Sequence, residues 1–203
     1  MSLPTRIEGY AIVSEDGMLA DRNGVMPASL KFEADQRFFE TGLDGVDAVA
    51  HGRHSHERQP HSPQRYRLIL TRQIPSLAPD RAKEKALLWN PRGASIEEAW
   101  SAFHLVEGSL GVIGGTSVFG LFLDHYDVFH LTRAPGVRLP GGRPVFPGVP
   151  RQSPEDSLAA HGLDQAQPKS SSTCASDHGP QGFGASYKWR NVCRHGSTPS
   201  RSP

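Results

Sequence analysis

The sequence predicts an α/β domain with a central, mostly parallel sheet flanked by helices. Three observations favour this class. Short apolar runs alternate with segments of helical spacing, two of those runs end in glycine just before a polar helix start, and the chain of 203 residues is long enough for one buried core. Strands separated by helical segments form βαβ units, and such units build parallel sheets.

The predicted strands are short runs rich in apolar and β-branched residues. They lie at residues 10–14, 47–50, 66–71, 86–90, 110–113 and 126–133. Glycine, aspartate and proline follow the first strand at residues 14–27 and the last one at residues 134–150, which indicates loops.

The predicted helices show apolar residues three and four positions apart. They lie at residues 30–40, 96–103, 117–123 and 154–161. In the first of these helices Leu30, Ala34 and Phe38 recur at every fourth position, and Ser29 is placed to cap its start. Gly162 is placed to close the last helix.

Composition narrows the function classes. The formal net charge is +1, which gives no general electrostatic case for nucleic acid or for a membrane surface, and no apolar run approaches the roughly 20 residues of a membrane span. The N-terminal residues have no apolar core of signal-peptide type, and both cysteines, Cys174 and Cys193, lie near the C-terminus. We expect a soluble cytoplasmic protein with a small-molecule partner. The oligomeric state is left open.

Residues 169–203 differ in composition from the rest. They are rich in Ser, Gly, Pro and Arg and show no period, so we expect a domain at residues 1–168 and a flexible tail at residues 169–203. The segment ASYKWRNVCR at residues 185–194 could instead pair as a last edge strand.

The strongest local motif is VIGGTSVFGLFL at residues 112–123. A buried strand ends in Gly114-Gly115, hydroxyl residues follow, and an apolar helix begins. A helix N-terminus with unpaired N–H groups attracts phosphate, and glycine lets the backbone approach a ligand closely. The same pattern also fits an ordinary strand-to-helix turn.

A second strand-to-helix turn reads AVAHGRHSHE at residues 48–57. Arg53 is placed to reach an anionic group beyond the strand end. His51, His54 and His56 have no recognised zinc spacing and no cysteine or paired acid to complete a site, so we expect no metal.

The helix after the first loop carries two candidate acids, Glu33 and Asp35. A carboxyl group held beside aromatic side chains in an apolar pocket has a raised pKa and can manage a proton. For at least one of the two, a solvated helix face is the expected place.

The order of these motifs resembles the dihydrofolate reductase family. The matching pieces are Met26-Pro27 at the loop end, the Phe38-Phe39 pair, GRHSHE at 52–57, LTR at 70–72, IGGTSVF at 113–119 and YDVFHLT at 126–132. Each piece is weak alone, and their shared order over residues 7–150 carries the resemblance. It implies the family's three-layer fold and a reductase that uses NADPH.

The resemblance also implies a role for individual residues. Gly114-Gly115 would form the family's strained, usually cis, peptide beside the nicotinamide and diphosphate, and Ser14–Pro27 would be a mobile lid. Cofactor contacts would come from Ala11, Ile12, Gly52, Arg53, His54, Ser55, Thr71, Arg72, Ile113, Thr116, Ser117, Val118 and Phe119. Arg53 and Arg72 would favour NADPH over NADH. Substrate contacts would come from Val13, Met26, Phe39 and Thr132, with Thr132 supporting the acid.

The sequence departs from the family at the substrate end. Counting forward from Met26-Pro27 places the acid at Glu33, and counting back from the Phe pair places it at Asp35. We favour Asp35, because Asp35 and Phe39 share a helix face. Ala28 stands where the family often has Trp, and Arg65 lies only loosely where the family binds a glutamate carboxylate.

Three functions follow from these patterns. The first is reduction of a dihydropterin, either dihydrofolate or the dihydromethanopterin of methylotrophic bacteria, by hydride transfer from NADPH to a C=N bond. The second is the pyrimidine reductase of riboflavin biosynthesis, which the stretch DQRFFETGLDGVDAVAHGRHSHE also resembles. That substrate is phosphorylated, and the sequence shows no extra basic cluster near Asp35. The third is a pterin- or nucleotide-binding module without catalysis.

Overall fold

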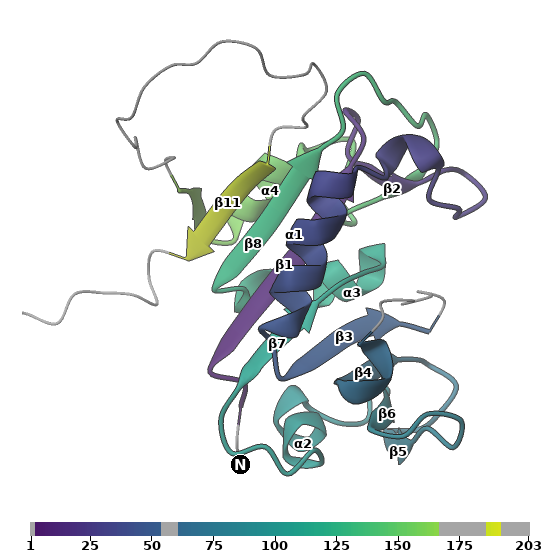
Figure 1. The fold of residues 1–203 in the computed structure, drawn as a ribbon, viewed down its shortest axis with the longest axis vertical. Helices are drawn as coiled ribbons and strands as arrows, with labels where there is room; N and C mark the ends of the chain where they lie inside the picture. The colour runs from purple at the N-terminus through teal and green to yellow at the C-terminus, as the bar shows by residue number, and fades with distance from the viewer. Residues whose placement is uncertain (1–2, 54–60, 167–185, 192–203) are drawn as a thin grey trace, which may run out of the picture.

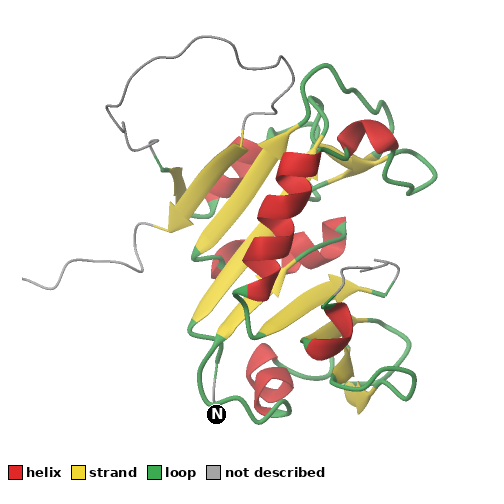
Figure 2. Ribbon diagram, in the orientation of Figure 1, coloured by secondary structure: helices red, strands yellow, loops and turns green. Residues whose placement is uncertain are grey.

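A nine-stranded sheet forms the centre of the protein (Figures 1 and 2). The structure is a computed structural model, and it describes residues 3–53, 61–166 and 186–191. The sheet has the order β10-β11-β8-β1-β7-β3-β4-β6-β5. Its strands are β1 (Arg6–Val13), β3 (Ala48–Gly52), β4 (Tyr66–Leu70), β5 (Leu77–Pro79), β6 (Ala86–Trp89), β7 (Ser109–Val112), β8 (Val128–Arg133), β10 (Leu163–Gln165) and β11 (Ser186–Asn191).

The predicted mostly parallel sheet is confirmed. The central pairs β8–β1, β1–β7, β7–β3, β3–β4 and β4–β6 are parallel, and antiparallel pairs occur at the two sides of the sheet. All six parallel strands therefore end at one edge, which we call the carboxyl edge. In sheets of this kind ligands bind at that edge.

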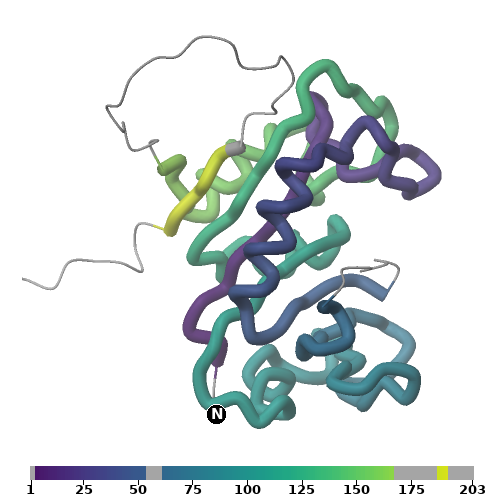
Figure 3. The backbone as a smooth tube through the Cα atoms, viewed as in Figure 1, coloured from purple at the N-terminus to yellow at the C-terminus, as the bar shows by residue number. Residues whose placement is uncertain are grey.

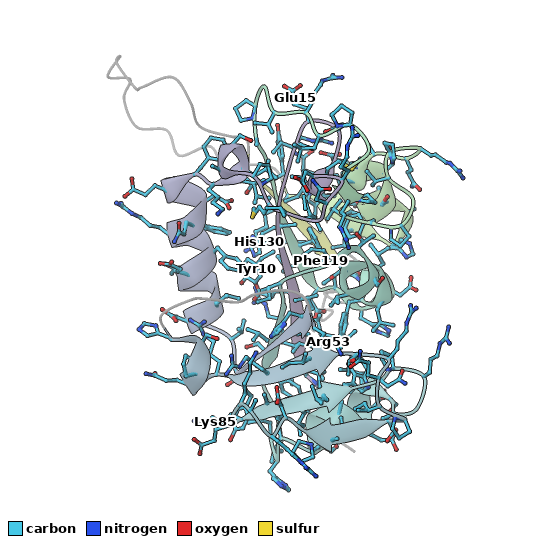
Figure 4. All side chains as sticks on the ribbon, turned by 90° about the vertical axis from the view of Figure 1, so that its right-hand side faces the viewer. Tyr10, Glu15, Arg53, Lys85, Phe119 and His130 are labelled. Carbon is cyan, nitrogen blue, oxygen red and sulfur yellow. The ribbon has the colours of Figure 1, made fainter. Side chains whose placement is uncertain are left out.

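Helices cover both faces of the sheet. They are α1 (Glu33–Asp44), α2 (Ile96–Ser101), α3 (Thr116–Leu121) and α4 (Pro154–Ala160), with 3-10 turns at Ala28–Leu30, Ser62–Gln64 and Leu123–His125. α1 lies on one face, and α3 lies on the other (Figures 1 and 4). The larger apolar cluster includes Trp100, Phe119 and Phe129, and a smaller one under α1 joins Tyr10, Leu43, Val46 and Val49.

α1 begins and ends later than the sequence predicts. Ser29 caps nothing, because Ala28–Leu30 forms a 3-10 turn and Phe32 is the extended residue before the helix. The helix then continues to Asp44, four residues past the predicted end. Leu43 explains the extension, since its side chain is fully buried against the sheet. Figure 3 lets the reader follow the chain from β1 through the loop into α1.

The last strand, β11, lies inside the sheet rather than at its edge. It pairs antiparallel with β8 on one side and with β10 on the other. Trp189 is buried there. The sequence indicated a strand here only as an alternative to a flexible tail, and as an edge strand. The edge position is taken instead by β10, which follows α4 and was not predicted. The rest of residues 169–203 lies outside the described residues.

The loop at residues 14–27 is not uniform. Its first half contains β2 (Met18–Ala20), which pairs with β9 (Arg143–Pro144) in a small second sheet that the sequence did not predict. The Asp16 carboxylate accepts the Leu139 N–H at 3.0 Å, and the Glu15 carboxylate accepts the Gly136 N–H at 2.8 Å. These bonds hold residues 14–20, so a lid could comprise only residues 21–27.

Candidate functional site

The sheet opens between β1 and β7 near the carboxyl edge. The register joins Gly9 to Val112 as the last β1–β7 pair, whereas the β1–β8 pairing continues to Val13. β7 stays with β3 beyond that point, and the Ile113 N–H donates to the Ala50 carbonyl at 3.0 Å. β1 is therefore left with an unpaired backbone edge at residues 10–13 within the described chain. Such a separation of central strands is a ligand-binding position in parallel sheets.

The Gly114-Gly115 turn lies beside this opening. The Gly52 N–H donates to the Gly114 carbonyl at 3.3 Å, which ties the end of β3 to the turn. Gly115 has φ +85°, a conformation that residues with a Cβ rarely adopt. The prediction of a cis Gly114–Gly115 peptide bond is wrong. Among the described residues the cis peptide bond is Val149–Pro150.

The first turn of α3 offers backbone groups more than side chains. Gly115 provides no side-chain cap, and the N–H groups of Thr116 and Ser117 meet no acceptor within the described chain. The Thr116 hydroxyl donates to the Pro144 carbonyl and is therefore already used. The Ser117 side chain is exposed.

Val118 and Phe119 do not line a ligand site with their side chains. Both side chains are buried, and the Phe119 ring packs at 5.6 Å from Phe129 and 6.4 Å from Phe146. Their N–H groups donate to the Gly115 carbonyl. The sequence prediction for these two residues is corrected, because the apolar face of α3 must cover the sheet.

Arg53 and Arg72 lie on neighbouring strand ends at the carboxyl edge. β3 and β4 are paired up to Gly52 and Leu70, and the Arg53 N–H donates to the Leu70 carbonyl at 3.1 Å. Both arginine side chains are exposed, and Arg53 is labelled in Figure 4. Thr71, which directly precedes Arg72, is buried, and its hydroxyl oxygen accepts the Gln73 N–H at 3.2 Å. His54 and Ser55 lie outside the described residues.

The two candidate acids differ in surroundings. The Asp35 side chain is half-buried and faces the sheet, where it is hydrogen-bonded to the side chain of Thr132. Burial raises the pKa of Asp35, and the Thr132 hydrogen bond opposes part of that rise. Glu33 is 79% exposed and forms an ion pair with Arg37. The geometry therefore brings Asp35, and not Glu33, to the sheet.

The residues around Asp35 form a mixed surface beneath α1. Thr132 lies on β8 beside Ile12 of β1. Phe39 packs edge-on to Tyr10, with ring centroids 6.2 Å apart, and with Ile113 it borders the smaller apolar cluster.

One predicted substrate contact, the Val13 side chain, is corrected, whereas Met26 stays a prediction. The Val13 side chain is fully buried in the larger cluster on the other face of the sheet, and its carbonyl accepts the Ala134 N–H at 2.8 Å. Met26 is partly exposed in the loop that precedes α1. Ala11, by contrast, is half-exposed on the unpaired stretch of β1.

Arg65 lies at the opposite end of α1 from the opening. Its guanidinium donates to the Asp44 carboxylate. The same carboxylate lies 3.0 Å from His61 Nδ1. These residues line a surface hollow of about 280 Å³ together with Leu43 and Gln64. Arg65 is therefore engaged by Asp44 rather than held open for a ligand carboxylate.

Sequence reasoning missed three polar residues under α1: Glu8, Tyr10 and His130. All three are buried, and they contact one another. A signal was present, because Glu8, Tyr10 and Ile12 alternate along one strand face. The predicted strand began at Tyr10, so Glu8 was left out.

The part of the chain that the structure describes contains neither a cluster of metal-ligating side chains nor a membrane-spanning helix. No group of three or more His, Cys, Asp or Glu side chains comes together there. Two of the three histidines considered as metal ligands, His54 and His56, lie outside the described residues. Among the helices that the structure describes, none is long and apolar enough to cross a bilayer.

Solved structures share this fold at low sequence identity. A dihydrofolate reductase from Enterococcus faecalis, complexed with NADP(H) and RAB-propyl, is 16% identical with a TM-score of 0.57, and the match covers 95% of this chain and 99% of that one. A riboflavin biosynthesis protein from Shewanella sp. PV-4 is 17% identical with a TM-score of 0.58, covering 92% and 98%.

A third similar structure is a bifunctional enzyme from Thermotoga maritima. It is a diaminohydroxyphosphoribosylaminopyrimidine deaminase/5-amino-6-(5-phosphoribosylamino)uracil reductase, 18% identical with a TM-score of 0.56, and the match covers 93% of this chain and 57% of that one. No protein-family model and no curated protein matches the chain. The comparisons confirm the predicted dihydrofolate reductase-like fold.

Proposed function

We propose that this protein is an NADPH-dependent reductase that transfers hydride to a C=N bond of a dihydropterin, with dihydrofolate and dihydromethanopterin as the two candidate substrates. One observation carries the proposal. A half-buried carboxyl group, Asp35, is hydrogen-bonded to Thr132 beside the opening between β1 and β7, and the Gly114-Gly115 turn follows β7 at that opening. The fold shared with an NADP(H)-bound dihydrofolate reductase supports it.

The residues of the opening fit a nicotinamide dinucleotide. Gly115 has a backbone conformation that favours glycine, and the N–H groups of Thr116 and Ser117 can receive a diphosphate. Arg53 and Arg72 supply two exposed cations for the adenosine end, which favours NADPH because its additional phosphate is a dianion. When bound, the cofactor supplies the hydride.

Asp35 would manage the proton. Because burial raises its pKa, the carboxyl group gives up its proton less readily than an exposed aspartate. Thr132 orients the carboxyl group, and Phe39 and Ile113 provide apolar surface beside it. Asp35, directly or through water, would support protonation of the ring nitrogen next to the reduced carbon. Residues 21–27 would close over the site and exclude water.

A pyrimidine reductase of the riboflavin type is a second candidate, and one feature of the structure favours it. β11 places Lys188 beside His130 and Arg190 beside Val128, on the strand next to the one that carries Thr132. Arg190 and Arg6 both lie close enough to Lys188 to lower its pKa, after the larger effect of burial. Lys188, two positions along β11 from the residue paired with Thr132, would be the cation that meets a substrate phosphate, whereas Arg190 and Arg6 lie toward the amino end of the sheet.

One assay distinguishes the candidates. Purified full-length protein is mixed with NADPH, and cofactor oxidation is followed with dihydrofolate, dihydromethanopterin or the phosphoribosylamino-pyrimidine. Oxidation with a dihydropterin supports the main proposal, and oxidation with the pyrimidine alone supports the alternative. NADPH binding without oxidation in any well would identify a binding module and overturn both reductase proposals.

A further inference from the structure

α1 packs over the smaller apolar cluster and also over a pair of stacked rings. The Tyr10 and His130 rings are nearly parallel, with centroids 4.8 Å apart and planes at 19°. The Phe38 ring of α1 lies edge-on to His130 at 5.1 Å, and Phe39 lies edge-on to Tyr10. Figure 4 labels Tyr10 and His130 between α1 and the sheet. We call Glu8, Tyr10 and His130 the platform.

Glu8 joins the two rings of the platform. Its Oε2 atom accepts the Tyr10 hydroxyl at 2.9 Å and lies 3.2 Å from His130 Nε2, while Oε1 lies 2.6 Å from Arg6 Nε. The hydrogen bond with His130 is the main reason that the pKa of Glu8 falls to about 2. Lys188 of β11 is paired in register with His130, and the Glu8 charge acts on it.

The fit between α1 and the platform is close. A Cβ added at Gly42 would come within 2.6 Å of the Tyr10 ring and 2.9 Å of its hydroxyl oxygen. Because only glycine allows this approach, the height of α1 above the sheet depends on where the Tyr10 ring lies. Leu43 is the one buried residue of α1, and Phe39 packs against the same cluster, so the contacts with the Tyr10 ring act together with these two.

The platform is also aligned with Asp35. Tyr10 pairs with His130 in the β1–β8 register, and the next pair on the same face joins Ile12 to Thr132, which is hydrogen-bonded to Asp35. On α1, Asp35 and Phe38 are three residues apart and lie on neighbouring positions of one face. A buried charged group such as the Glu8 carboxylate costs folding stability compared with an apolar side chain. We therefore look to the position of α1 for what Glu8 contributes.

We infer that Glu8, Tyr10 and His130 are positioning residues that hold α1, and with it the Asp35 carboxyl group, against Thr132. The inference rests on the proposed function only for the effect on turnover. The position of Asp35 is a separate property that can be measured without substrate.

The test uses full-length protein and two conservative variants. Tyr10→Phe keeps the ring and removes the hydroxyl, and His130→Phe keeps the ring and removes the bond to Glu8. The control is Asp124→Asn, which disrupts another carboxylate–histidine pair, Asp124 with His161 at 2.6 Å, away from α1. The titration of the Asp35 carboxyl group is followed by carbon NMR in each protein.

We expect the pKa of Asp35 to fall toward that of an exposed aspartate in both platform variants, because a displaced α1 lets water reach the carboxyl group. Asp124→Asn should titrate as the parent does. With a substrate that the parent reduces, kcat should fall about tenfold in the platform variants while the KM for NADPH changes less than about twofold.

The inference is overturned if both folded platform variants titrate at Asp35 as the parent does. If His130→Phe does not fold, Tyr10→Phe decides the question, since it removes a single oxygen atom. If the parent protein reduces none of the tested substrates, the proposed function fails while the titration still tests the platform.

Discussion

The two ends of the candidate site are built in different ways. The proposed cofactor end, at the carboxyl ends of β3, β4 and β7, presents backbone groups at Gly115 and exposed guanidinium groups at Arg53 and Arg72. The proposed substrate end, under α1, consists of side chains that contact one another, namely half-buried Asp35 with Thr132 and buried Glu8 with Tyr10 and His130. Binding of a nucleotide needs donors and charge at an open edge, whereas proton management needs a carboxyl group kept from water.

This difference predicts that substitutions at the two ends separate binding from turnover. Changes at the cofactor end should alter NADPH affinity and leave the reaction of bound substrate nearly intact. Changes at the substrate end should do the reverse.

Asp35→Asn should lower kcat about 100-fold or more, because the amide cannot manage the proton, while the Kd for NADPH stays within about twofold. Single-turnover kinetics and fluorescence titration with NADPH measure the two quantities. The matched control is Glu33→Gln, two residues earlier on an exposed face, and it should behave as the parent does. Equal loss in Glu33→Gln with none in Asp35→Asn would reverse the assignment of the acid.

Gly115→Ala should raise the Kd for NADPH about tenfold or more, because the added Cβ disfavours the positive φ of Gly115, the residue that precedes the first turn of α3. At saturating NADPH, kcat should change less than about threefold. Gly136→Ala is the control, since Gly136 has φ +70° and open space around it, so that substitution imposes similar strain away from the site. Equal affinities in the two variants would exclude a role of the Gly-Gly turn in cofactor binding.

Arg72→Gln should reduce the preference for NADPH over NADH about tenfold, since one cation near the additional phosphate is lost. The ratio of kcat/KM for the two cofactors measures the change. Arg151→Gln removes an exposed arginine before α4 and should leave the ratio unaltered. A preference that survives in an Arg53→Gln/Arg72→Gln double variant would place the phosphate elsewhere.

Asp35→Asn should also stabilise the protein at neutral pH, by about 2 °C in Tm. The folded-state pKa of Asp35 is raised by burial, so its contribution to stability is present below the unfolded pKa and is lost as pH rises through the folded pKa. At about pH 7 the ionised carboxylate therefore costs stability, and a neutral amide does not. Thermal melts of both proteins should show the gain shrinking toward acid pH, and a Tm advantage that grows on acidification would contradict this sign.

Particular elements show what could be predicted from the sequence. The runs at β3, β4, β6 and β7 carry apolar residues that must be buried on both faces, so their strand character follows from composition. The glycine pair and the two arginines follow those strands directly, so their place at one edge could be predicted from local order. The Gly-Gly bond geometry and the buried side chains of Val118 and Phe119 could not, because they depend on packing between α3 and the sheet.

The substrate end required the tertiary structure. β11 is separated from β8, its partner in the sheet, by more than fifty residues, and the spacing of its own residues did not distinguish an inner strand from an edge strand. The choice between Glu33 and Asp35 depended on the register of α1, which begins later than its apolar period suggests. The contact of Glu8 with His130 joins residues 122 positions apart.

The sequence alone was therefore sufficient for the α/β class, for the mostly parallel sheet and for the candidate residues at both ends, because burial patterns and turn residues act over a few neighbouring positions. Only the tertiary structure decided which acid meets the sheet and what holds it there. The physical reason is that desolvation and hydrogen bonding of a side chain are set by whatever packs against it, and here that is a distant strand.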